Sequence, residues 1–242
     1  MSTLKLKRKK SKKEKKNRII LIIVILLIDI FLILSFIRIN EAININNLNH
    51  RFYHLLEINI TSDEYDNKLD TTGKYRTAEK AMNCYFIDYS KDVKALLDVI
   101  SDNELTSLLS VDKYNNENNN LNNKISMIDK TREDLDNKFN KLYDYSKEDS
   151  IKRYIRSKTT NKGAIEVFNK YMLSIDAHDH FDDCNSILKA KQDEVNNILE
   201  TSKEVYTFLI NNEGKWLIKD NQIQFANGSL KEQYDGMVSK VK

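Results

Sequence analysis

The chain has 242 residues, enough for one domain with its own core beside a membrane segment, and it contains no proline and only five glycines. Folds rich in β-strands need Gly and Pro at many turns, so this composition excludes an all-β architecture and favours helices. The net charge of +3 hides an asymmetry: residues 1–18 hold ten Lys or Arg and one Glu, or +9, which leaves 3 − 9 = −6 for the remainder. This tail lacks aromatic residues to stack on bases, so we exclude nucleic acid as a partner.

An apolar run follows the basic tail. Residues 19–37 are apolar except for Asp29 and Ser35, and this length crosses the roughly 30 Å hydrocarbon core as one helix. The positive charge before it predicts a cytoplasmic N-terminus and an extracytoplasmic remainder. The run is longer than a secretory signal, and no Ala-x-Ala pattern follows it, so we expect an uncleaved signal anchor. The predicted parts are a cytoplasmic tail (1–18), a single transmembrane anchor (19–37) and an extracytoplasmic helical domain (38–242).

Asp29 is the costly residue in this run. A central Asp costs about 2.5–3.5 kcal/mol on insertion scales, which the surrounding Leu, Ile and Phe residues outweigh. One interpretation is contact with a polar or basic residue of a partner helix, or with a second copy of the chain. The other is a tolerated polar side chain that stays hydrated.

Apolar periodicity predicts the elements that come next. We expect a helix from Glu41 to Ile60 that either continues out of the membrane or restarts just above it. A polar connection over residues 61–73 and an amphipathic helix from Lys74 to Ile100 are expected next. Ser101 and Glu104 form a capping-box pattern, which predicts the start of another helix.

The second half continues the helical pattern and ends differently. Apolar residues in steps of four and three, interrupted by Arg132, predict a heptad seam between helices packed side by side; they are Leu121, Ile125, Ile128, Leu135, Phe139 and Leu142. The asparagine-rich tract 115–123 is either an exposed helical face or a frayed joint. A short helix is expected over Glu148–Lys158 and one long helix after Gly163.

The C-terminal part has the pattern of a hairpin. Apolar residues alternate around Asp220-Asn221, which predicts a β-hairpin within about residues 205–226, and Ser229 begins a final short helix. The expected fold is mainly α: an N-terminal transmembrane helix, an elongated antiparallel bundle of three or four long helices, the hairpin and the final helix.

One short segment carries several side chains that bind metals. Asp176, His180 and Cys184 fall at successive steps of four, on one helical face, and His178 lies beside them. Carboxylate, imidazole and thiolate are zinc ligands, and His50 with His54 would add to the site if the fold brought them near. The alternative is a solvated polar helix with Cys184 as a small buried side chain.

The two cysteines permit one disulfide. Cys84 and Cys184 both lie in the predicted extracytoplasmic part, where an oxidising environment allows a bridge between them. The alternative is two buried thiols.

Aromatic residues form two groups along the chain: Tyr75, Tyr85, Phe86 and Tyr89, and then Tyr143, Tyr145 and Tyr154. Such groups either line a groove for cell wall or peptide, or form core.

Motifs of catalysis are missing from the sequence. There is no Gly-x-Ser-x-Gly, no glycine-rich phosphate loop and no His-Glu-x-x-His. We therefore expect a non-enzymatic binding, scaffold or spacer module without a cofactor, whose partner is a protein, a second copy or the cell wall. The alternatives are a metal-binding protein or metal-dependent enzyme that uses the Asp176–Cys184 segment, and an accessory or inhibitory subunit assembled through the transmembrane helix.

The layout resembles that of single-pass membrane-anchored helical surface proteins of low-GC Gram-positive bacteria. The shared features are the lysine-rich start, the Ile/Leu anchor and the ending Trp216-x-x-x-Asp220-Asn221-x-Ile223-x-Phe225. The layout is also similar to that of small bitopic division proteins, with a cytoplasmic tail and an extracytoplasmic coiled coil. Both resemblances imply a non-enzyme and carry no catalytic residues.

Overall fold

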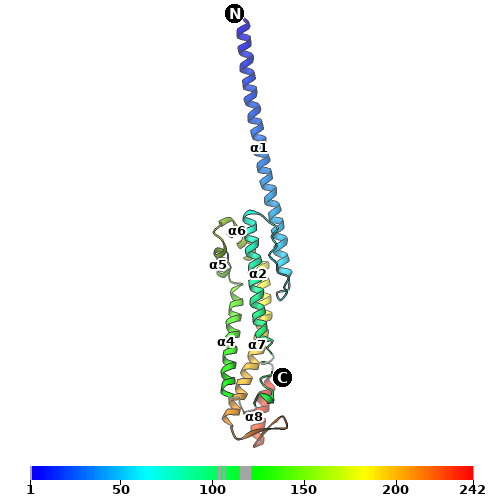
Figure 1. Ribbon diagram of the computed structural model, residues 1–242, viewed down its shortest axis with the longest axis vertical. Helices are drawn as coiled ribbons and strands as arrows, with labels where there is room; N and C mark the ends of the chain where they lie inside the picture. The colour runs from blue at the N-terminus through cyan, green and yellow to red at the C-terminus, as the bar shows by residue number, and fades with distance from the viewer. Residues whose placement is uncertain (1, 103–104, 106, 115–120, 242) are drawn as a thin grey trace.

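The computed structural model describes residues 2–102, 105, 107–114 and 121–241, and these form a slender helical rod (Figure 1). The chain is 79 % helical with seven α-helices in the described part, which confirms the predicted fold class. The elements in chain order are α1 (Ser2–Glu57), α2 (Gly73–Ile100), η1 (Val111–Tyr114), α4 (Leu121–Asp144), α5 (Glu148–Lys158), α6 (Lys162–Met172), α7 (Ile175–Asn211), β1 (Trp216–Lys219), β2 (Gln222–Phe225), α8 (Gly228–Val238) and η2 (Ser239–Val241).

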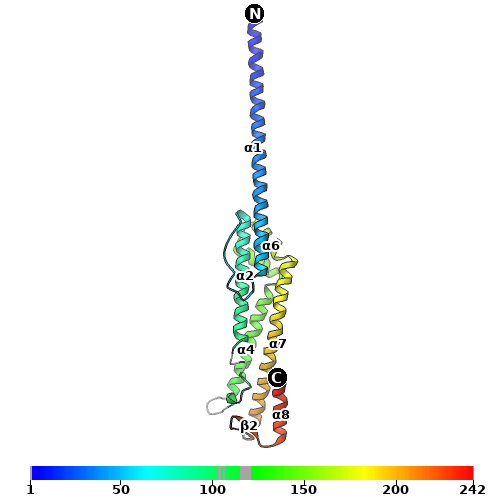
Figure 2. The same ribbon diagram turned by 90° about the vertical axis from the view of Figure 1, so that its right-hand side faces the viewer.

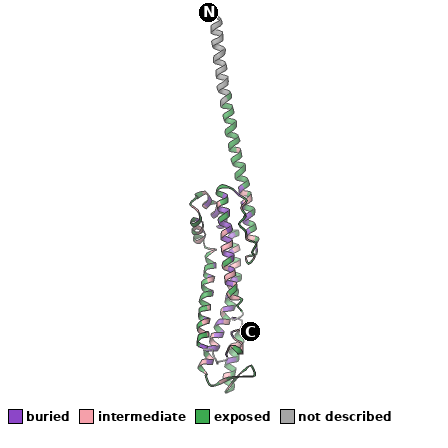
Figure 3. Cartoon of the chain, in the orientation of Figure 1, coloured by how far each residue is buried: buried purple, intermediate pink, exposed green. Residues whose placement is uncertain are grey.

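Helix α1 has two environments along one uninterrupted length of 56 residues, or about 84 Å at 1.5 Å per residue. Its first part stands clear of the bundle, and the described large apolar side chains of residues 21–39 are 45–72 % exposed (Figure 3). Its last turns belong to the core, where Leu48, Phe52 and Leu55 are at most 1 % exposed. The apolar run and the first helix of the bundle are therefore one element.

The bundle is built from α2, α4 and α7, which lie side by side with alternating directions (Figures 1 and 2). The predicted seam of α4 is its buried face, because Ile128, Leu135 and Leu142 are at most 1 % exposed. Arg132 interrupts that face without being buried, since its guanidinium lies outside and pairs with Glu200 of α7 at 2.5 Å. Polar residues at the edge of the seam thus join the helices that its apolar residues pack together.

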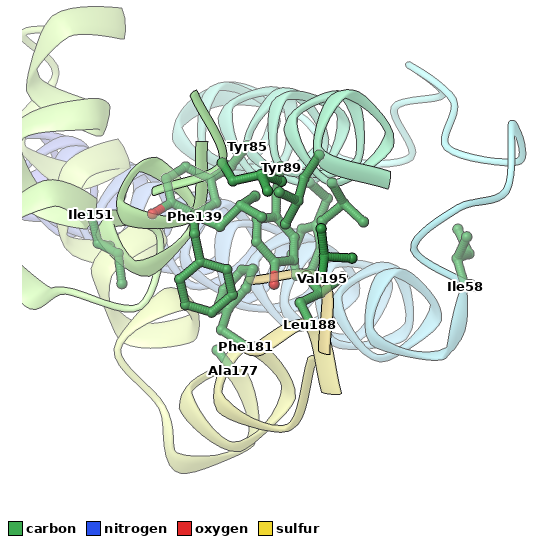
Figure 4. Packing of buried hydrophobic residues seen from close by; sticks show 14 of the residues in the cluster. Ile58, Tyr85, Tyr89, Phe139, Ile151, Ala177, Phe181, Leu188 and Val195 are labelled. Carbon is green, nitrogen blue, oxygen red and sulfur yellow. The ribbon is translucent and has the colours of Figure 1, made fainter. Parts of the chain in front are cut away.

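Aromatic side chains fill the part of the core that lies nearer the end from which α1 emerges (Figure 4). Phe181 of α7 is fully buried, and its ring centroid lies 4.9 Å from Tyr89, 5.5 Å from Phe86 and 5.9 Å from Tyr85 on α2. The hydroxyl of Tyr89 donates to Asn185 Oδ1 at 3.0 Å, so its polar end is satisfied inside the core. The first aromatic group, which also includes the buried Tyr75, is core rather than a groove.

The structure corrects two boundaries. The single helix expected after Gly163 is divided between α6 and α7, because the Ser174 side chain accepts from the Ala177 N–H and begins a new helix. The hairpin is shorter than the predicted 205–226, since α7 continues to Asn211 and only Trp216–Phe225 forms the strand pair. The capping pattern at Ser101–Glu104 and the asparagine tract fall largely outside the described residues.

The hairpin turn agrees with its sequence. Asp220 and Asn221 have φ of 52° and 56°, the conformation of a two-residue turn that matches the twist of paired strands. A lone hairpin is only marginally stable, and here Phe225 packs on Phe208 of α7 and Tyr234 of α8. These contacts fix the hairpin at the end of the rod that lies away from the N-terminus (Figure 2).

Removal of the Phe181 ring tests the aromatic core. We expect Phe181→Ala to lower the free energy of unfolding by about 3–5 kcal/mol, because the cavity lies among rings that cannot collapse into it. The measurement is urea denaturation of the full-length protein in detergent, followed by circular dichroism. Ile187→Ala on the same helix is the control: Ile187 is 68 % exposed, and its removal should change stability by less than about 0.5 kcal/mol. Equal losses in both variants would contradict this packing.

Candidate functional site

A non-helical segment, residues 58–72, joins α1 to α2 and is called the strap here. Backbone N–H groups that are buried without a hydrogen-bond partner are costly. Because the strap has no regular structure, side chains must accept the hydrogen bonds of its backbone N–H groups. Glu79 of α2 is fully buried and supplies them: its carboxylate accepts from the N–H of Asp70 at 3.0 Å, and from the N–H and hydroxyl of Thr71 at 3.1 and 2.7 Å. The N–H of Thr72 donates to Asn44 of α1 at 2.6 Å.

Arg51 of α1 holds the middle of the strap. Its side chain is 6 % exposed and donates to the Asp66 carbonyl and to Asn83 Oδ1, both at 2.9 Å, while it also pairs with the Asp66 carboxylate. The Asn83 amide in turn donates to the Lys68 carbonyl at 3.0 Å. The buried guanidinium is therefore paired with a carboxylate and hydrogen-bonded through Nε and Nη2, as a charge in such a place requires.

A polar cleft of about 610 Å³ opens between α1 and the strap. Its lining is polar or charged throughout: Asn46, Asn47, His50, Arg51, His54, Asp66, Lys68 and Asp70. The volume lies within the range of small-molecule sites, roughly 300–1,000 Å³, but such sites are mostly apolar. The cleft therefore fits a small polar ligand that carries both hydrogen-bonding and charged groups.

The acids of the cleft are already paired. Burial works to raise the pKa of Asp66, but hydrogen bonds from the Lys68 N–H and the Arg51 guanidinium outweigh it, and the pKa is lowered. Asp70 lies 3.6 Å from the Lys68 ammonium. A lowered pKa keeps the Asp66 carboxylate ionised, which suits a structural anion and not a general acid.

The residues of the predicted metal cluster face different surroundings on α7. The His178 imidazole pairs with Asp182 at 3.1 Å on the surface, and Asp176 accepts from the Tyr53 hydroxyl of α1 at 3.0 Å. His180 instead packs against the rings of Phe86 and Phe181. Within the described residues, no three His, Cys, Asp or Glu side chains gather where they would hold a metal ion. A metal site in the Asp176–Cys184 segment stays a prediction that this geometry does not favour.

His50 and His54 lie elsewhere, in the lining of the cleft. Helix α1 does contact the start of α7, but through Tyr53, which lies between His50 and His54 in the sequence and donates to Asp176.

The two cysteines are free thiols, each half-buried. Burial, with Asp183 nearby, raises the pKa of Cys184, so its reactive thiolate form is rare. The structure thus holds Cys84 and Cys184 as separate small side chains, and a disulfide between them stays a prediction.

Tyr145 and Tyr154 of the second aromatic group line a smaller recess of about 210 Å³, together with Tyr85, Lys141, Asp144 and Ser150. The Tyr145 hydroxyl donates to Asp92 at 2.7 Å, and the Tyr154 hydroxyl donates to Asp88 at 2.9 Å. Both phenols are thereby fixed to α2, and burial raises their pKa before the nearby carboxylates add to the effect. Tyr143 is 39 % exposed and lies apart from this lining.

Comparison with known proteins gives no relative: no family profile, curated protein or solved structure matches this chain. Any function must therefore be inferred from the geometry of the chain alone.

Arg51→Met tests the hold on the strap. We expect amide hydrogen exchange over residues 66–72 to rise at least about tenfold, because hydrogen bonds to charged groups are worth about 1.5–3 kcal/mol each. The measurement is hydrogen exchange with mass spectrometry on the full-length protein. Arg156→Met, at an exposed arginine of α5, is the matched control and should leave the strap unchanged. An unaltered strap in Arg51→Met would contradict the assigned network.

His180 makes stability depend on pH. Burial lowers its pKa below the ordinary 6.5, and Asp183 opposes this only in part. The unfolded chain therefore takes up a proton before the folded one, so stability is full above about pH 6.5 and falls as the pH drops toward the folded pKa. We expect His180→Phe to lose less thermal stability than the unmodified chain between pH 7 and pH 5. His178→Gln, at an exposed histidine of the same helix, should behave like the unmodified chain. A wild-type pH slope in His180→Phe would refute the assignment.

Proposed function

We propose that this chain is a single-pass membrane protein with a cytoplasmic basic tail, and that its extracytoplasmic bundle is a non-enzymatic binding or spacer module. The observation that carries the proposal is the two-part environment of α1. Within the described residues, α1 is the one helix long and apolar enough to cross a membrane.

The exposed part of α1 has the surface of a membrane helix. The described large apolar residues between Leu21 and Ile39 are all exposed, in the part of α1 that stands clear of the bundle (Figure 3). An apolar surface of this extent does not stay in contact with water, and a bilayer covers it completely. The charge of +9 in the preceding tail favours the cytoplasm for the N-terminus.

The bundle has the properties of a binding or spacer module. Its interior is filled with apolar and aromatic side chains, and the acids of its polar cleft pair with Arg51 and Lys68. Polar groups thus support the backbone of the strap, and the cleft remains open to a small polar ligand. This arrangement supports binding more than bond-breaking chemistry.

A second function is favoured by Asp29. This residue is exposed near the middle of the span, where α1 stands alone (Figure 1). A polar partner for its carboxylate must then come from another helix in the membrane, as in an accessory or inhibitory subunit. Asp29→Leu should release proteins that co-purify with the chain, whereas Asp29→Asn should retain those bound by a hydrogen bond.

Fractionation tests the anchor and its orientation. We expect the full-length chain, expressed in a bacterial host with a C-terminal tag, to stay with membranes after alkaline carbonate washing. Proteinase added to intact protoplasts should remove the tag and leave a protected N-terminal fragment. A variant that lacks residues 1–40 is the control and should appear in the soluble fraction. Release by carbonate would refute the anchor, and a protected tag would refute the orientation.

A further inference from the structure

We infer that the membrane-facing end of the bundle docks on the anionic headgroups of phospholipids. This inference rests on the proposed membrane anchor. The docking surface, called the basic cap here, consists of Arg38, Lys74, Arg76, Lys158 and Lys162, all of which are exposed.

Three elements meet at this end of the bundle, around Glu41 of α1. The start of α2 and the turn between α5 and α6 lie at the end from which α1 emerges (Figures 1 and 2). The Lys74 ammonium is 3.2 Å from Glu41 Oε1. Gly163, in the first turn of α6, lies against the Lys74 side chain, since a methyl group added to this glycine would be 3.2 Å from Lys74 Cδ. The contacts of Lys74 thus bring the starts of α2 and α6 to the level of Glu41.

This level coincides with the depth of the lipid headgroups. Glu41 follows Ile37, the last residue of the apolar run, by four residues, which is a rise of about 6 Å along a helix. The headgroup regions add about 5–7 Å to the hydrocarbon core on each side. Because α1 has no break between these residues, the ammonium of Lys74 reaches the headgroups whenever the apolar run spans the bilayer.

The charge at this end is opposite to that of the chain beyond the tail. Residues 19–242 carry −6 in total, yet the cap presents five cations. Glu41 accepts from Lys74 and from the Tyr75 hydroxyl at 2.9 Å, and Asp70 lies beside Lys68. Each Lys or Arg near an anionic membrane surface favours the docked state over the undocked one roughly fivefold. Any three residues of the basic cap together therefore favour docking roughly a hundredfold.

Docking would hold the rod upright. A single helix permits the bundle to tilt over the membrane, whereas a second contact through the basic cap fixes its axis near the membrane normal. The far end, with the hairpin and α8, is then presented at a set height above the surface (Figure 2).

A fluorescence experiment tests the docking. The full-length chain with Cys84→Ala and Cys184→Ala receives a single cysteine by Thr160→Cys in the α5–α6 turn and is labelled with a nitrobenzoxadiazole fluorophore. It is inserted into vesicles of phosphatidylcholine, alone or mixed with phosphatidylglycerol, that contain a lipid with a nitroxide on its headgroup. A label at Ser229→Cys, in α8 at the far end, reports the background.

We expect the nitroxide to quench the label at residue 160 more strongly in the anionic vesicles. The triple variant Arg76→Gln, Lys158→Gln, Lys162→Gln should lose this excess, with the docked fraction reduced roughly a hundredfold relative to the undocked one. Lys130→Gln, Lys215→Gln, Lys219→Gln removes the same charge from exposed residues nearer the far end and should keep it.

The outcomes separate the two proposals. A chain that floats with the vesicles but shows equal quenching in neutral and anionic lipid overturns the docking alone. The docking is also overturned if the cap variant and the control variant are quenched equally. A chain that does not float with vesicles overturns the membrane anchor and, with it, the docking.

Discussion

The packing of the last turns of α1 against the bundle is the contact on which the rest of the structure depends. Leu48, Phe52 and Leu55 enter the core without any break in the helix that begins in the basic tail. The apolar run and the bundle therefore share one axis, and no flexible linker separates them. The chain must then run back along α1 before it enters α2, which is why a strap is needed. The strap lies over a buried polar surface.

The strap shows how buried charge is used where regular structure is missing. Glu79 and Arg51 are both buried, and each is hydrogen-bonded to groups of the strap or of α2. Replacing such groups with apolar ones would not satisfy the N–H and C=O groups that they bind, so the polar residues set one conformation of the strap. The cleft is a by-product of that conformation, and its polar lining follows from the same side chains.

Periodicity predicted the helices well because it reports which face is buried. The α4 seam, the α2 face and the hairpin turn follow directly from spacing. The break at Ser174 was missed because Met172 and Ile175 keep the apolar spacing across it. For the predicted metal cluster, spacing alone says less: it put His180 and Asp176 on one face, while the neighbours of that face differ along α7. The strap network was also missed, although Arg51 lies within the apolar stripe of α1.

An unbroken helix also fixes rotation about its axis. Asp29 and Asn47 are separated by 18 residues, which is about five complete turns, so both side chains leave α1 in the same direction. Asn47 lines the polar cleft. A neighbouring transmembrane helix that met Asp29 would thus lie on the same side of α1 as the cleft.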